Sequence, residues 1–129
     1  MPVALHAPDL AIHVRLDPYA PREARFHIAR VDRPSPDLRD AVTLLTSELV
    51  TRAVQQCEHQ GEQAVELRVW MPADVVRVEL EGPRNLLLPP LEPEGPRYDV
   101  MLLERLADRW GVEAEESLPY MWFEIDRHD

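Results

Sequence analysis

The sequence predicts an α+β fold, a two-layer sandwich in which a mixed, mostly antiparallel sheet is covered on one face by about three helices. Runs with period-two alternation occur in adjacent pairs, which is typical of antiparallel hairpins, and stretches with helical periodicity separate them. The resulting order, β-α-α-β-β-loop-α-β-β, groups hairpins beside helices and favours the α+β class. At 129 residues we expect a single domain over 1–129.

The first strand is predicted at 10–16, after an N-terminal segment (1–9) that we expect to be irregular. Apolar side chains alternate along this run, which indicates a half-buried strand. A short helix is predicted from Pro21, and Pro34 ends it because proline cannot continue a helix.

The strongest helical signal covers 36–59. Pro36 suits the first helical position, and Asp37 would face the positive end of the helix dipole. Apolar residues recur every three or four positions, as one face of a helix requires. These residues are Leu38, Val42, Leu45 and Leu49.

Two alternating runs, 64–71 and 74–81, are separated only by Pro72 and Ala73, so an antiparallel hairpin is predicted. The segment 82–97 holds five of the 13 prolines and is interpreted as a stiff loop. Its leucine-rich stretch, 86–91, either fills a pocket or forms an exposed patch for a partner.

A helix is predicted at about 99–110, with Trp110 on its apolar face, Asp99 as its N-cap and Gly111 as its stop. Two closing strands are predicted at 112–117 and 120–126.

Composition limits the function. All 14 basic residues are arginine, and 24 acids give a net charge of −10, which argues against nucleic-acid or anionic-membrane partners. No apolar run is long enough to span a bilayer, and Met1–Pro8 lacks the pattern of a signal peptide, so we expect a soluble cytoplasmic protein.

Cys57 is the only cysteine in the sequence, and we interpret it as a small buried hydrophobic residue. The histidines show no metal-ligand spacing, so no metal site is predicted.

Three segments resemble a known family. Ser47–Val54 (SELVTRAV) resembles the SELVTNAV motif of small bacterial anti-sigma-factor serine kinases. Leu103–Val112 (LERLADRWGV) resembles the LVEALADRWGV that follows the ATP lid in that family, and Trp122–Glu124 (WFE) resembles its closing strand. The resemblance runs from about residue 14 to 126 with the motifs in the family's order.

These kinases belong to the GHKL superfamily, with the histidine-kinase-like (Bergerat) ATPase fold. The resemblance therefore implies that fold and, as partners, a sigma factor or an anti-sigma-factor antagonist. It also implies a homodimer, because family members commonly dimerise. Fold alone does not carry the activity, so the family's nucleotide-binding elements need to be compared one by one.

The long predicted helix keeps one of these elements and loses another. Glu48 matches the family's catalytic glutamate, a general base. Arg52 stands where the family has the Mg²⁺-binding asparagine, and a guanidinium has no acceptor for a metal. Three roles are open for Arg52: an i, i+4 ion pair with Glu48, occupation of the metal position, or a metal-free grip on phosphate together with Arg84 or Arg97.

The adenine-binding aspartate and the lid depart from the family. Either Glu81 or Gly82 falls at the aspartate position, depending on a one-residue gap. The glycine-rich lid, whose amides would hold the phosphates, is replaced by Pro96, Arg97, Tyr98 and Asp99.

We therefore interpret the chain as a pseudo-kinase that acts by protein–protein interaction and needs no cofactor. Glu48 would be catalytic only if the chain is active, and Arg52, Glu81, Gly82, Arg97 and Asp99 would outline a vestigial ATP pocket. The alternative is a divergent serine/threonine kinase that still binds ATP with Mg²⁺. A third hypothesis is a structural subunit of a larger signalling complex.

Overall fold

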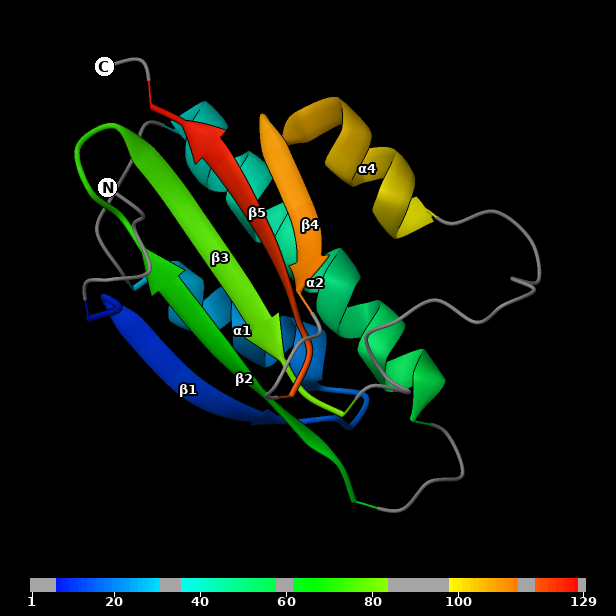
Figure 1. Ribbon diagram of the computed structural model, residues 1–129. Helices are drawn as coiled ribbons and strands as arrows, with labels where there is room; N and C mark the ends of the chain where they lie inside the picture. The colour runs from blue at the N-terminus through cyan, green and yellow to red at the C-terminus, as the bar shows by residue number, and fades with distance from the viewer. Residues whose placement is uncertain (1–6, 31–35, 58–61, 84–97, 114–117, 128–129) are drawn as a thin grey trace.

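The computed structural model describes residues 7–30, 36–57, 62–83, 98–113 and 118–127. Its elements follow the predicted order (Figure 1). They are β1 (Leu10–Arg15), α1 (Ala20–Ile28), α2 (Pro36–Gln56), β2 (Ala64–Trp70), β3 (Val75–Glu81), α4 (Tyr98–Leu106), β4 (Arg109–Glu113) and β5 (Tyr120–Asp126). The α+β class is confirmed.

The five strands form one sheet in the order β1-β2-β3-β5-β4. All of its described pairings are antiparallel, so the expectation of a mixed sheet is wrong for this part of the chain. The predicted β2–β3 hairpin is confirmed, with Val69 opposite Val78. The connections between β2 and β3 and between β4 and β5 are short, which favours antiparallel pairing within these two pairs.

Helices α1, α2 and α4 lie on one face of the sheet (Figure 1). Alternate strand residues point toward them and form the core with the apolar stripes of the helices. Among the most buried side chains are Phe123, Ile28, Leu45, Leu67, Leu80 and Leu103. Cys57 is also buried, as predicted, and its thiol donates to the carbonyl oxygen of Val54 at 3.2 Å.

The C-terminal boundaries differ from the prediction. Helix α4 ends at Leu106, not at residue 110, and Trp110 lies in β4 opposite Phe123. Gly111 is not a helix stop but a strand residue opposite Trp122, where an added Cβ would lie 3.1 Å from the indole Nε1. The segment fits both periodicities, and pairing with β5 decides in favour of the strand.

Several predicted features lie outside the described residues. They are the N-terminal segment up to residue 6, the predicted helix-ending residues Pro34 and Gly61, most of the 82–97 loop including Arg84, Arg97 and the leucine run, and residues 114–117 of the predicted strand.

Candidate functional site

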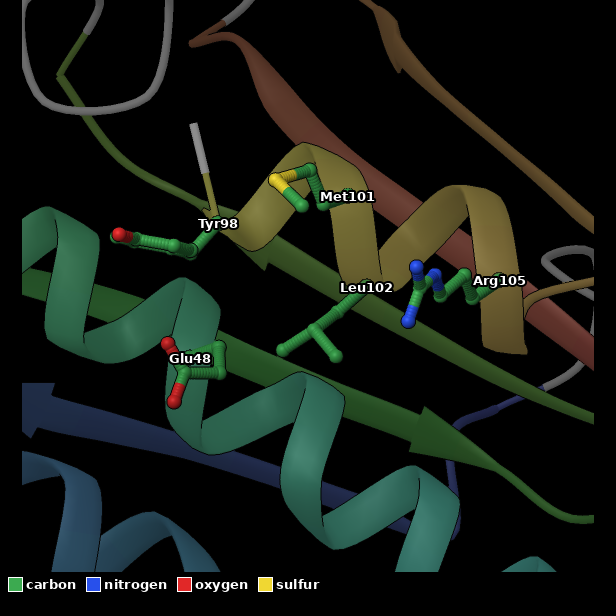
Figure 2. A pocket seen from close by; sticks show the side chains of 5 residues that line it. All are labelled: Glu48, Tyr98, Met101, Leu102 and Arg105. Atoms are coloured by element: carbon green, nitrogen blue, oxygen red, sulfur yellow. The ribbon is translucent and has the colours of Figure 1, made fainter. Parts of the chain in front are cut away.

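A pocket of about 350 Å³ lies between α2 and α4. It is lined by Glu48, Tyr98, Met101, Leu102 and Arg105 (Figure 2). Glu48 comes from α2, and the other four share one side of α4, because positions i, i+3, i+4 and i+7 of a helix face the same way. The volume falls in the range of small-molecule sites, about 300–1,000 Å³.

The pocket combines an apolar middle with opposite charges at its two sides. Leu102 points from α4 toward α2, between the Glu48 carboxylate and the Arg105 guanidinium (Figure 2). Within the described part of the chain, neither of these two charged groups takes part in an ion pair. The site therefore offers one anion and one cation to whatever occupies it.

Arg52 does not line this pocket, although it lies one turn beyond Glu48 on α2. With the Gln56 amide in the orientation that satisfies both groups, its oxygen accepts hydrogen bonds from Arg52 Nε and Nη2, at 3.2 and 2.8 Å. The Glu48–Arg52 ion pair, one of the three roles left open for Arg52, is not among the ion pairs of the described residues. Arg52 binds the next turn of its own helix instead.

Asp99 lies within the first turn of α4, because the helix begins at Tyr98. The expectation that Asp99 is the N-cap is therefore wrong, because Asp99 is the second residue of the helix, two positions beyond the N-cap. Its side chain is buried, with 5% of the residue exposed, and it lies at the positive end of the helix dipole.

Glu81 lies on the sheet face opposite the helices, since it alternates with Val78 and Leu80, which belong to the core. Its carboxylate accepts a hydrogen bond from Arg68 at 3.1 Å. The structure therefore does not bring Glu81 together with Glu48.

Gly82 is buried at the end of β3, where an added Cβ would lie 2.8 Å from Cγ1 of Val65. That close approach gives the glycine a packing role in the β2–β3 ladder. Of the predicted site residues, only Glu48 lines the pocket, while Arg97 lies outside the described residues.

Met101, Leu102 and Arg105 were not predicted as site residues. The signal that could have identified them is the second stripe of the 98–105 segment, on the side away from the buried Leu103. Only the packing of α4 beside α2 shows that this stripe faces Glu48.

A second polar cluster lies on the sheet face opposite the helices. The Glu79 carboxylate lies between Arg68 and Arg77, with Oε2 accepting from Arg77 Nε at 2.9 Å. Arg77 also binds Glu124 at 2.9 Å and stacks over the Trp122 ring, 4.5 Å from its centroid. The network continues to Arg109 and Asp126 on one side and to Glu66 and Glu81 on the other.

The charges of this cluster shift one another's titration. Burial lowers the pKa of Arg68, but its hydrogen bonds to Glu79, Glu81 and Glu66 outweigh burial and raise that pKa above its ordinary value. For Glu124, burial raises the pKa, but hydrogen bonds from Arg109 and Arg77 outweigh it and lower that pKa below its ordinary value. These charges satisfy one another, which favours a structural role for the cluster.

Among the described residues, no group of three or more His, Cys, Asp or Glu side chains is arranged to hold a metal ion. Within the same residues, no helix has the length and apolar character needed to cross a bilayer. Fold and site thus define a two-layer α+β protein with a charged and apolar pocket between two helices. Neither a scan against protein-family models nor a search of curated proteins finds a match.

Proposed function

We propose that this chain is a cytoplasmic regulatory protein of the GHKL type that resembles anti-sigma-factor serine kinases and acts by binding another protein, without Mg-ATP chemistry. The partner class that the resemblance implies is a sigma factor or an anti-sigma-factor antagonist. In this mechanism the protein sequesters its partner, and the affinity does not depend on ATP.

The lining of the pocket beside Glu48 carries the proposal. In the family, that glutamate works next to a metal-binding asparagine and a glycine-rich lid. Here the pocket wall is made of the side chains of Tyr98, Met101 and Leu102, and Arg52 is bound to Gln56. Asp99, which lies in the first turn of α4 and is 5% exposed, stands where the resembled family has a lid glycine.

One observation favours the second candidate, a divergent ATP-binding serine/threonine kinase. Glu48 faces a pocket large enough for a small molecule, with the Arg105 cation beside it. In that case Glu48 would act as the general base, and arginines would hold the phosphates.

Titration calorimetry separates the two candidates. The full chain is titrated with ATP in the presence of Mg²⁺ and, separately, with ATP and a chelator. We expect no binding heat in either titration. Binding of ATP that requires Mg²⁺ would overturn the proposal in favour of a kinase. Binding of ATP in the presence of the chelator would indicate that the chain holds the phosphates without a metal ion.

A second experiment addresses the partner. Purified candidate sigma factors and anti-sigma-factor antagonists are immobilised, and the affinity of the chain is measured with and without Mg-ATP. The proposal expects one partner to bind with the same dissociation constant under both conditions. An affinity that changes with ATP contradicts it.

A further inference from the structure

One wall of the pocket between α2 and α4 runs along most of α4. Its side chains come from positions that extend from Tyr98 to Arg105, which is about 10 Å along the helix axis. Between these two ends, Met101 and Leu102 give the wall an apolar surface (Figure 2). A molecule that lies along this wall is therefore extended and has an apolar middle.

The pocket holds one negative and one positive group, on opposite sides of Leu102 (Figure 2). Glu48 supplies the carboxylate from α2, and Arg105 supplies the guanidinium from α4. Neither group takes part in an ion pair within the described residues. The charges therefore match a ligand that carries the opposite charge at each of its two ends.

From this arrangement we infer that the α2–α4 pocket binds a short zwitterion whose ammonium and carboxylate groups are separated by an apolar chain, as in an ω-amino acid. The ammonium group binds the Glu48 carboxylate, and the ligand carboxylate accepts hydrogen bonds from Arg105. The chain between them covers Leu102. An α-amino acid does not fit, because both of its charges are attached to one carbon and cannot reach both sides of Leu102.

This ligand class differs from the nucleotide that the resemblance would assign to this face, and it goes beyond the protein partner of the proposed function. It is tested without ATP or a partner, so either idea can fail without the other. Met101 and Arg105 are exposed, so the ion pairs form in contact with water and each contributes modestly. We therefore expect weak, reversible binding in the millimolar range.

The test is a titration of the isotope-labelled full chain with 6-aminohexanoate, followed by two-dimensional NMR. We expect saturable shifts of amide signals from α2 and α4 around Glu48 and Arg105. Hexanoate and hexylamine each lack one of the two charges, and we expect both to bind about two- to fivefold more weakly. Leucine, an α-amino acid, is expected to give no saturable shift.

Salt is required in this titration, because the net charge of −10 attracts any cation. At about 0.15 M it screens exposed charges beyond roughly 8 Å, so the long-range attraction of hexylamine is suppressed. The contacts within the pocket are shorter and remain measurable.

Variants assign each end of the ligand to its residue. Glu48→Gln removes the partner of the ammonium group, so 6-aminohexanoate is expected to bind this variant no more tightly than hexanoate does. Arg105→Gln removes the partner of the carboxylate, so 6-aminohexanoate is expected to bind it no more tightly than hexylamine does. The matched control, Glu104→Gln, changes an exposed α4 charge that does not line the pocket, and it keeps the wild-type preference.

Circular dichroism and thermal unfolding confirm that each variant is folded. If a variant does not fold, the comparison of the probes on the wild-type protein decides the question by itself. Absence of binding, equal affinities for 6-aminohexanoate, hexanoate and hexylamine, or shifts confined to other elements overturns the inference. A folded Glu48→Gln protein that keeps the full preference for 6-aminohexanoate over hexanoate overturns it as well.

Discussion

The Glu79 carboxylate accepts two hydrogen bonds from Arg68 on the neighbouring strand, with Oε1 at 3.1 Å from Nε and 3.0 Å from Nη2. Its other oxygen binds Arg77, so one carboxylate joins two arginines at the centre of the sheet. The Glu79 side chain is only 5% exposed, and the Arg68 side chain is 16% exposed. This pair stabilises the fold on the face that no described helix covers.

Removing this charge is expected to destabilise the protein. Glu79→Gln leaves two largely buried guanidinium groups without their shared anion, and we expect the free energy of unfolding to fall by about 3 kcal/mol, the low end for breaking a buried pair. Arg68 retains Glu66 and Glu81, which limits the loss. Urea unfolding measures the effect. The exposed control Glu113→Gln is expected to change it by less than about 0.5 kcal/mol, and equal effects would contradict the role of Glu79.

Acid is expected to weaken the fold partly through Glu124. Hydrogen bonds from Arg109 and Arg77 outweigh burial and hold the pKa of Glu124 below the ordinary carboxyl value of 4.5. A carboxyl whose pKa is lower in the folded state stabilises the protein fully above the unfolded value and loses this contribution as pH falls through the folded value. The stability difference between wild type and Glu124→Gln should therefore shrink below pH 4.5. Urea unfolding at a series of pH values tests this, and a difference that grows in acid contradicts it.

Gly82 is expected to tolerate no side chain while Val65 is present. The added Cβ of Gly82→Ala would lie 2.8 Å from Val65 Cγ1, inside the buried end of the β2–β3 hairpin. Overpacking of this kind costs about 1–3 kcal/mol. Val65→Ala removes the conflicting atom, so the double variant should lose less stability than the two single losses added together. Simple additivity of the measured unfolding free energies would show that the contact does not limit this position.

Cys57 is expected to react slowly with thiol reagents in the native state. The residue is 6% exposed, and its thiol contacts the backbone of α2 and of Leu16. Modification with a chromogenic disulfide should therefore follow unfolding and accelerate steeply across the urea transition. Rapid labelling of the folded protein would instead identify an accessible, reactive thiol.

Arg52→Asn is expected to leave nucleotide binding undetectable. The substitution introduces the residue type that binds Mg²⁺ in the kinases that the proposed function invokes, but the side chains of Tyr98 and Met101 still line the pocket. A thermal-shift assay with Mg-ATP should show no change for this variant. A variant that also restores glycines at the lid is the matched comparison, and a shift with Arg52→Asn alone would show that the lid is not limiting.

Local patterns in the sequence predicted most of the fold. The alternation in 64–71 and 74–81 predicted the hairpin and its core face, and the apolar stripe of the long helix predicted α2. The same alternation also predicts that Glu81 lies on the sheet face opposite Val78 and Leu80, which belong to the core. The interpretation of Glu81 as a pocket residue overlooked this signal.

Three features were decided only by the tertiary structure. Trp110 fits a helix or a strand, and pairing with Phe123 of β5 places it in a strand. Arg52 can reach along α2 in either direction, and it binds Gln56 rather than Glu48. The residues of α4 that face Glu48 depend on how the two helices pack.

The sequence by itself determined most of the helices and strands and which side of each is buried, because periodicity acts through neighbours along the chain. The exception is the segment 109–113, whose periodicity fits a helix or a strand. The tertiary structure decided which charged groups meet. Glu48 and Arg105 are 57 positions apart in the chain, and only the packing of α4 beside α2 gives them one pocket.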